Sequence, residues 1–379
     1  MKISPANRRK LKSILVVTFA WLLIGQASVF YNALTVEAYH EYDDNFDIGS
    51  SILTNIFASI IAGLVGGYLL VVVLKDRFKT KPLWYSIVAH ILSIVALIVA
   101  VSSIASIFFN SLTLDKAFFD PLVLKEAINF ITSFGFLQIM VIWTTVTALT
   151  VVALQINDKY GHGVLFDLLL GKYHTPKQET RIFMFLDIKS STGIAEKLGH
   201  EKYFNLLNEF FEDITTAIIN SEGEIYQYVG DEIVVTWRME EGLRDANCLK
   251  CFFETEKIIA KLSEKYLDQY GLTPDFKAAL HYGEVTTGEV GTVKKDIIFT
   301  GDVLNTTSRM QELCNKFGVN LLISEKLLDK LSYEDMFDVV ELGDIELRGK
   351  QQKIKLFCAK VKGSSAPVAN QSVDVLSAN

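Results

Sequence analysis

The sequence predicts a two-part protein, in which a bundle of four transmembrane helices precedes a soluble α+β domain. Three observations support this prediction. Half of the 379 residues are hydrophobic, the longest apolar stretches all lie in the first 155 residues, and charged residues with alternating helix and strand patterns follow them. Membrane spans produce such a composition, which is unusual for a soluble chain. We expect a transmembrane domain at 1–155, a cytoplasmic coupling linker at 156–180, the α+β domain at 181–362 and a disordered tail at 363–379.

Each of the four apolar stretches meets or exceeds the roughly 20 residues that cross a bilayer as a helix. They are 13–34, 51–74, 83–112 and 128–155. The N-terminal tail and the second loop are basic, whereas the first loop is acidic. Basic segments stay in the cytoplasm. We therefore expect a multi-pass protein of the cell (inner) membrane, in contact with the lipid bilayer, with both termini and the α+β domain in the cytoplasm.

For several residues the sequence allows two interpretations of their role. Gly63 and Gly67 form a GxxxG face, which either lets two helices approach closely or is incidental. His90 lies within a predicted span, where it is either a haem, metal or proton site or a neutral, hydrogen-bonded side chain. Cys248 and Cys251 form a CxxC pair within a helical pattern, which favours core packing over a metal site. The net charge of −7 gives no basic surface for a nucleic-acid partner.

The soluble half has the pattern of a sheet with helices. The spacing predicts strands at 181–188, 224–229, 232–238, 276–285 and 296–300, and helices at about 192–220, 244–270 and 302–317. The second and third strands are joined by the tight turn Gly230–Asp231, which indicates a hairpin. Shorter strands are expected at 319–360.

Two acidic residues lie at the ends of predicted strands, where they could bind metal ions. Asp187 follows an apolar strand, and Asp231 lies in the hairpin turn. If these strands are neighbours, both carboxylates project from one edge of the sheet, an arrangement that suits Mg²⁺ or Mn²⁺. A pair of such ions can stabilise a displacement at phosphorus. On position alone, a structural role for each Asp is the commoner explanation.

Two further groups of polar residues fit phosphate chemistry. Ser190, Ser191 and Thr192 lead into a helix, whose N-terminus can cradle a phosphate, although Ser and Thr are also ordinary helix caps. Asn305 and Arg309 are four residues apart and therefore share a helix face. An amide and a guanidinium there could orient a sugar and neutralise a phosphoryl group. A solvated helix face explains their spacing equally well.

Taken together, these motifs resemble the class III adenylate and guanylate cyclases. The resemblance rests on Phe185-Leu186-Asp187-Ile188, then Gly230-Asp231-Glu232, then Gly301-Asp302-x-x-Asn305-x-x-x-Arg309, and finally Glu346-Leu347-Arg348-Gly349-Lys350. The motifs occur in the family's order and cover about 181–360. The resemblance implies a ferredoxin-like cyclase catalytic domain that forms a cyclic nucleotide and pyrophosphate from a nucleoside triphosphate.

The resemblance also implies a role for each matching position. Asp187, Asp231 and the backbone carbonyl of Ile188 would hold two Mg²⁺ or Mn²⁺ ions. Asn305 would orient the ribose, and Arg309 would stabilise charge at the α-phosphate. Arg348 stands where the family has a Lys that grips the terminal phosphates. Family members form dimers with composite sites, so this chain would act as a homodimer.

Two positions depart from the family's pattern. Gln227 stands where the family has Lys or Glu, and Ile298 where it often has Asp, Thr or Cys. Both positions would face the base, and the Gln227 amide can pair with either purine. We predict an adenylate cyclase, because the Glu typical of guanylate cyclases is absent. A guanylate cyclase that makes cyclic GMP and a catalytically silent membrane receptor that only binds nucleotide remain the alternatives.

Overall fold

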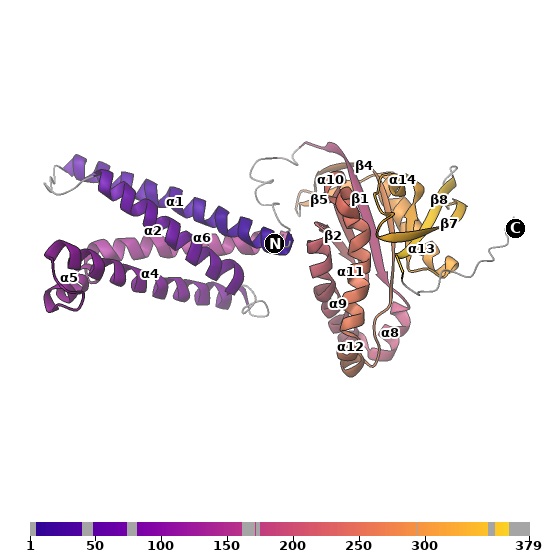
Figure 1. Cartoon of the computed structure of the whole chain (residues 1–379), viewed down its shortest axis with the longest axis horizontal. Coiled ribbons are helices and arrows are strands. Elements are labelled where there is room, and N and C mark those ends of the chain that lie inside the picture. Colours follow the sequence, from indigo (N-terminus) through magenta and orange to yellow (C-terminus); the bar gives the residue numbers. More distant parts are fainter. Residues whose placement is uncertain are drawn as a thin grey trace. The chain divides into compact units, whose positions relative to one another are not determined.

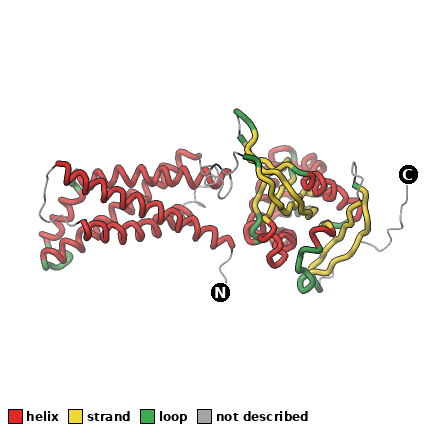
Figure 2. Tube along the Cα trace, turned by 90° about the horizontal axis from the view of Figure 1, so that it is seen from above, coloured by secondary structure: helices red, strands yellow, loops and turns green. Residues whose placement is uncertain are grey.

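The structure is a computed structural model that describes residues 5–39, 48–73, 82–160, 171, 175–293, 295–347 and 353–363. Contacts divide the chain into two compact units, one formed by Asn7–Leu165 and the other by the remaining residues. Within the described residues, every strand belongs to the second unit (Figure 2). The predicted tail at 363–379 lies almost entirely outside the described residues, as does most of the predicted linker.

The first unit consists of helices. They are α1 (Pro5–Tyr39), α2 (Ile48–Tyr68) with its continuation η1 (Leu69–Val73), α4 (Leu83–Leu114), α5 (Pro121–Ile131) and α6 (Phe134–Tyr160) (Figure 1). Among the described residues, four segments are long and apolar enough to cross a membrane: Pro5–Thr35, Asn55–Val73, Trp84–Phe108 and Phe134–Asn157. Trp21, Ile94 and Val151 are buried where α1, α4 and α6 pack together.

The fourth apolar stretch differs from its prediction. We expected one helix over 128–155, but α5 ends at Ile131 and α6 begins at Phe134. Ser133 accounts for the break, because its hydroxyl accepts a hydrogen bond from the Phe136 amide at 3.1 Å, as a helix cap does. The periodicity of apolar residues runs across this break and therefore does not reveal it.

Contacts in the helical unit bear on two of these residues, Gly63 and His90. A Cβ on Gly63 would lie 2.7 Å from the Cα of Thr18, so the GxxxG face lets α2 approach the backbone of α1. His90 is buried, and its Nδ1 contacts the backbone oxygen of Ser86. Gln155 donates to the Ser86 hydroxyl at 3.3 Å, which links α6 to α4. These contacts favour the hydrogen-bonded interpretation of His90.

The second unit is built on one mixed sheet. Its strands are β1 (Lys177–Ile188), β2 (Glu224–Val229), β3 (Glu232–Arg238), β4 (Phe276–Val290), β5 (Asp296–Thr300), β6 (Leu321–Ser324), β7 (Phe337–Glu346) and β8 (Lys353–Val361). Their order is β2-β3-β1-β4-β6-β8-β7, and β5 pairs with β4. Only the β4–β6 pair is parallel among the described pairs.

Helices cover both faces of this sheet. One face packs against α9 (His200–Asn220), α11 (Asn247–Lys261), α12 (Ser263–Tyr270) and the short α14 (Glu325–Leu328), around Met184, Phe210 and Trp237. The other face packs against α13 (Asp302–Phe317), as Figure 1 shows. Strand β1 is buried on both faces, because Met184 belongs to the first core and Phe183 to the second. The predicted α+β fold is confirmed.

Two predicted helices are each interrupted. The helix expected at 192–220 is α8 (Ser191–Leu198) followed by α9, and Gly199 between them has a φ of +78°. The helix expected at 244–270 contains α11 and α12 and begins late, because Asp245 and Ala246 have positive φ values. By contrast, β2, β3, β5 and α13 have the bounds that the pattern predicts.

Substitution of Phe210 by Ala should destabilise the second unit. The Phe210 ring is fully buried and lies 5.7 Å from the ring of Phe276. Removing a buried ring typically costs about 3–5 kcal/mol. Hydrogen exchange of the β1 amides in the full-length protein measures this loss. Phe204→Ala is the matched control, because Phe204 lies on the same helix with 62% of its surface exposed. Equal effects of the two substitutions would contradict the assignment of this core.

Candidate active site

The register of β1 places Asp187 between two neighbouring strands. Asp187 pairs with Glu232 of β3 on one side and with Lys277 of β4 on the other. The Nζ atom of Lys277 lies 3.4 Å from Oδ2 of Asp187. The Lys277 side chain is only 10% exposed and that of Asp187 only 20%, so solvent screens this ion pair weakly.

Asp231 reaches the same end of the sheet from the β2–β3 turn. Gly230 in this turn has a φ of +64°, a conformation that glycine adopts without strain. Burial raises the pKa of Asp187, and a hydrogen bond with Asp231 and the charge of Asp231 raise it further. A hydrogen bond with Gln311 and the positive charge of Lys277 lower the pKa of Asp187. The two carboxylates therefore lie close together at one edge of the sheet, the arrangement expected if their strands are neighbours.

A third carboxylate adds to the negative charge here. Glu232 is half-buried, and burial together with the charges of Asp187 and Asp231 raises its pKa to about 7. Lys277 lowers the pKa of Glu232 as well as that of Asp187. This end of the sheet thus concentrates acidic groups around one buried ammonium group, an environment that favours binding of an additional cation.

The donor atoms fit a hard divalent cation. Carboxylate and carbonyl oxygens are the ligands that Mg²⁺ and Mn²⁺ prefer, and Asp187 and Asp231 supply two carboxylates. The Ile188 side chain is buried in the core between the sheet and helices α9 and α11, so only its backbone can contribute a ligand. Within the described residues, no group of three or more His, Cys, Asp or Glu side chains is arranged to hold a metal ion. An ion here would need further oxygen ligands from water or substrate.

The hydroxyl residues follow Asp187 directly. Ser190 has a φ of +55°, which turns the chain sharply from β1 into α8. Its side chain makes no capping hydrogen bond to α8. Ser191 is the first residue of α8, and Thr192 next to it is exposed. The first turn of α8 therefore presents backbone N–H groups and hydroxyls within five residues of Asp187, as a phosphate cradle requires.

Helix α13 carries Asn305 and Arg309 but directs them away from Asp187. Gln311 on this helix is buried, and its amide lies near the Asp187 carboxylate. Successive helix residues turn by roughly 100°. Arg309 therefore points about 200° around the helix from Gln311, and Asn305 about 120°. Neither has a hydrogen-bond or ion-pair partner in the part of the chain that the structure describes. The structure thus does not unite them with this chain's own carboxylates.

A glycine fixes the start of α13 against the sheet. A Cβ on Gly301 would lie 2.6 Å from the backbone oxygen of Glu284 on β4, a distance that real Cβ atoms essentially never show. Only glycine allows this close approach without a shift of the backbone. The first turn of α13, which includes Asn305 on its exposed side, is thereby held directly on β4.

The two positions expected to face a base lie on edge strands. Gln227 is exposed on β2, and Ile298 is half-buried on β5. The adjacent residues Tyr226 and Phe299 connect the two strands. The Phe299 amide donates a hydrogen bond to the Tyr226 hydroxyl at 3.1 Å. Side chains alternate along a strand, so Ile298 lies on the face of β5 opposite Phe299. A role for Ile298 in the substrate site stays a prediction.

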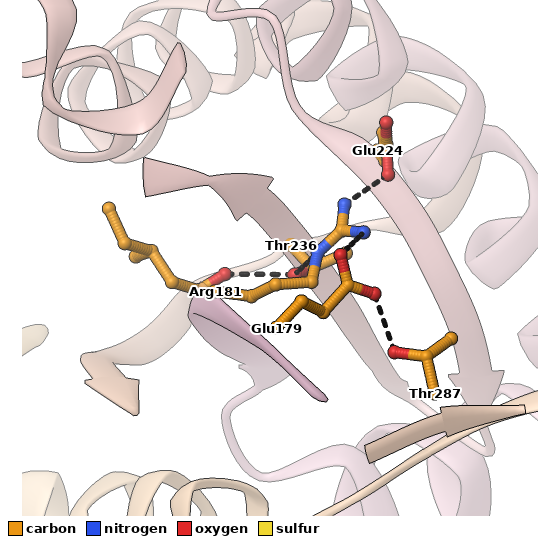
Figure 3. Close-up of polar contacts among 6 residues, drawn as sticks. Glu179, Arg181, Glu224, Thr236 and Thr287 are labelled. Atoms are coloured by element: carbon orange, nitrogen blue, oxygen red, sulfur yellow. Dashed lines mark hydrogen bonds and ion pairs between the residues drawn. The ribbon is translucent and has the colours of Figure 1, made fainter. Parts of the chain in front are cut away.

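A buried arginine on β1 is the centre of a polar cluster that joins neighbouring strands (Figure 3). Arg181 is ion-paired with Glu224 of β2 and with Glu179 of β1. It donates to the Thr236 hydroxyl on β3 at 3.2 Å, and Thr287 of β4 donates to Glu179. The guanidinium carbon lies 4.9 Å from the centre of the Phe299 ring on β5. This cluster fixes β2 and β5 relative to β1.

Arg348 and the cysteines complete the positions singled out from the sequence. Arg348 lies outside the described residues. Cys248 and Cys251 are free thiols in the core between the sheet and helices α9 and α11. Burial raises the pKa of each to about 12. Thiols that resist ionisation are poor metal ligands. The prediction that this pair is ordinary core packing therefore agrees with its surroundings.

Sequence reasoning missed Lys277, Gln311 and Tyr226. A signal existed for Lys277, because it interrupts the apolar run 276–280, where an isolated charge needs a partner. Gln311 gave a weaker signal as a polar residue on the apolar side of a helix. Tyr226 looked like an ordinary strand residue, because its role depends on a register shift that periodicity does not encode.

Comparisons with known proteins give a consistent relationship. Residues 173–360 match the adenylate and guanylate cyclase catalytic domain family. The chain is 34% identical over 201 residues to adenylate cyclase 2 of Rhizobium meliloti (strain 1021), covering 53% of this chain and 55% of that relative. It is 27% identical over 183 residues to an adenylate cyclase of Anabaena cylindrica, covering 47% of this chain and 36% of the relative. The chain thus spans about half of the first relative and about a third of the second.

The similarity extends to solved structures. A bacterial light-regulated adenylyl cyclase aligns with a TM-score of 0.50 at 19% sequence identity, over 59% of this chain and 64% of that chain. At this identity the likeness concerns the fold alone. It agrees with the mixed sheet and the helices on both of its faces.

Replacement of Lys277 by Met should destabilise the metal-free protein. The substitution leaves Asp187 without its buried counter-charge beside two other carboxylates. An unpaired buried polar group typically costs about 1–3 kcal/mol. Thermal unfolding of the full-length protein in a chelator measures this loss. Added Mn²⁺ should raise the unfolding temperature of this variant more than that of the wild type. Lys257→Met, an exposed lysine on α11, is the control. An equal Mn²⁺ effect in both proteins would refute a cation site beside Lys277.

Proposed function

Because residues 173–360 of this chain form a member of the adenylate and guanylate cyclase catalytic domain family, we propose that the protein is a membrane-bound class III nucleotidyl cyclase. It converts ATP to 3′,5′-cyclic AMP and pyrophosphate for intracellular signalling. The observation that carries this proposal is the Asp187–Asp231 carboxylate pair, held at the end of β1 on a sheet of the cyclase fold.

The carboxylates would hold the metal ions that this chemistry needs. Asp187, Asp231 and the backbone carbonyl of Ile188 are the proposed ligands of two Mg²⁺ or Mn²⁺ ions. Bound there, the ions would stabilise the attacking and leaving oxygens of an in-line displacement at phosphorus. Lys277 and Gln311 would orient Asp187 as outer-shell residues do. Their positions beside this carboxylate support the assignment.

The remaining residues would bind and orient the substrate. The first turn of α8, with Ser190, Ser191 and Thr192, would hold phosphate oxygens, and Arg348 would bind the terminal phosphates. Asn305 would orient the ribose so that its 3′-hydroxyl releases its proton to solvent while its oxygen bonds to the α-phosphorus. As the bond to the β-phosphate breaks, Arg309 would stabilise the charge that develops, and pyrophosphate would leave.

The direction of α13 supports a homodimer with composite sites. Arg309 and Asn305 point away from this chain's own Asp187, and neither has a partner within the described residues. In a two-fold dimer, the same surface of each chain serves the other, so each site would combine the carboxylates of one chain with the Asn/Arg pair of its partner. Two equivalent sites follow from the symmetry.

The proposed base preference rests on two observations. No Glu stands at the position of Gln227, and the two relatives compared above are adenylate cyclases. Both points favour ATP. The Gln227 amide can donate and accept, so GTP and a cyclic GMP product form the specific alternative. A catalytically silent receptor is the second alternative, motivated by the atypical base positions and the helical unit.

The helical unit would anchor the enzyme. We propose that residues 1–155 span the cell membrane four times, that 156–180 couple the bundle to the catalytic domain at 181–362, and that 363–379 form a tail. The four long apolar helices support this organisation. Both termini would lie in the cytoplasm, where ATP is available and the product acts.

Complementation between two inactive variants tests the reaction and the composite site together. Asp231→Ala and Arg309→Ala should each abolish cyclic nucleotide formation from ATP and GTP with Mn²⁺. Co-expressed at equal levels, they should recover about a quarter of wild-type activity, because half of the dimers are mixed and each mixed dimer keeps one intact site.

Asp268→Ala, an exposed substitution on α12, serves as the control for these variants and should retain wild-type activity. No product from the wild type with either nucleotide would refute the cyclase. Activity in the wild type without recovery in the mixture would instead refute the composite site.

The membrane proposal has a separate test. The full-length protein should remain in the membrane pellet after alkaline extraction, because four apolar helices hold it in the bilayer. A fluorescent reporter that matures only in the cytoplasm should be bright when fused to either terminus. Release by alkaline buffer, or a dark reporter at one end, would contradict the proposed topology.

A further inference from the structure

Strand β2 contains a β-bulge at Tyr226, shortly before the Gly230–Asp231 turn that joins β2 to β3. Ile225 pairs with Val235 of β3, and Gln227 pairs with Val234, so Tyr226 is the extra residue. In such a bulge two residues oppose one on the partner strand, and the bulged strand re-aims its side chains. Tyr226 and Gln227 together occupy the place of a single residue opposite Val234.

The hairpin register and the bulge together place Gln227 and Tyr226 on one face of the sheet. Val234 belongs to the core beneath α13, whereas Ile233 belongs to the core beneath α9 and α11. The tight turn pairs Val229 with Glu232, and the same register brings Gln227 opposite Val234. With the bulge, Gln227 lies on the same face as Tyr226, and its side chain is exposed.

The Tyr226 hydroxyl ties the bulge to β5. It accepts a hydrogen bond from the Phe299 amide at 3.1 Å, and the two rings are 4.8 Å apart. β5 pairs only with β4 among the described strands, so this amide is satisfied by a side chain rather than by another strand. Without the hydroxyl, the amide would lose its protein acceptor.

A second connection holds the same two strands and explains why they stay in place. The Arg181 guanidinium lies over the Phe299 ring at 4.9 Å and is ion-paired with Glu224 at the start of β2 (Figure 3). Arg181 therefore fixes the ring of Phe299, while Tyr226 fixes its backbone. The two contacts act on different atoms, so loss of the hydroxyl alone should leave the packing of β5 intact.

From these contacts we infer that Tyr226 is a positioning residue for base recognition, which acts by holding the bulge so that Gln227 is presented to the purine. The inference rests on the proposed function, in which Gln227 faces the base. A Gln amide selects a ring edge only if its donor and acceptor are fixed in place. The hydroxyl of Tyr226, hydrogen-bonded one residue away, supplies that constraint.

Tyr226→Phe tests this role with the loss of one oxygen. The KM for ATP should rise about tenfold, the effect of one hydrogen bond, while kcat changes less than about twofold. The ratio of kcat/KM for ATP to that for GTP should fall, because a loosened amide discriminates less. The unfolding temperature should fall only slightly, because the Phe299 amide loses its acceptor while Arg181 still holds the ring, and Mn²⁺ affinity, measured on the same full-length protein, should match the wild type.

Tyr228→Phe is the matched control, because it removes the same oxygen two residues away. Tyr228 pairs with Ile233 and packs on Phe211, on the opposite face of the sheet. Its hydroxyl has no hydrogen bond to any described residue. This variant should keep the KM and the base preference of the wild type.

A double-mutant cycle shows whether Tyr226 acts through Gln227. In the Gln227→Ala background, Tyr226→Phe should cause no further loss of base preference, because the residue it positions is gone. Additive effects in this cycle, or equal effects of Tyr226→Phe and Tyr228→Phe, would overturn the inference while leaving the cyclase intact. Absence of any cyclase activity in the wild type would instead refute the proposed function.

Discussion

The register of β1 between β3 and β4 is the constraint on which the proposed active site depends. Because residues alternate faces along a strand, a shift by one residue would exchange the two cores of the sheet. Met184 would then face α13, and Phe183 would face α9. Both faces of β1 are filled with buried apolar side chains, so this exchange is excluded by packing. The same packing fixes Asp187 beside Lys277 and near Asp231. It does so although the carboxylates of Asp187 and Asp231 repel each other.

Helix α13 serves two purposes that its geometry separates. Its buried side carries Gln311 to the Asp187 carboxylate and packs Met310 against β4 and β6. The other side of the helix presents Asn305 and Arg309. In a dimer with composite sites, this one rigid helix would touch the carboxylates of its own chain and the substrate of its partner's site.

The sequence was sufficient wherever local pattern and tertiary structure agree. The hairpin of β2 and β3, the bounds of α13 and the convergence of Asp187 and Asp231 follow from alternation, turn residues and strand order. It was insufficient where a contact between distant segments decides. The pairing of Lys277 with Asp187 depends on β4 lying beside β1, which no local signal encodes. The break before α6 depends on one serine cap within a continuous apolar pattern.

Under the proposed function, the bulge at Tyr226 would make the identity of residue 227 an incomplete guide to base specificity. A Lys or Glu at position 227 would offer only donors or only acceptors, so its charge could select a ring edge across some range of positions. The neutral amide of Gln227 offers both and therefore cannot select by chemistry alone. If Gln227 faces the base as proposed, selection would depend on where the amide is held, next to the Tyr226 hydroxyl that is hydrogen-bonded to β5. Base preference would then depend on the placement of the strand as well as on side-chain type.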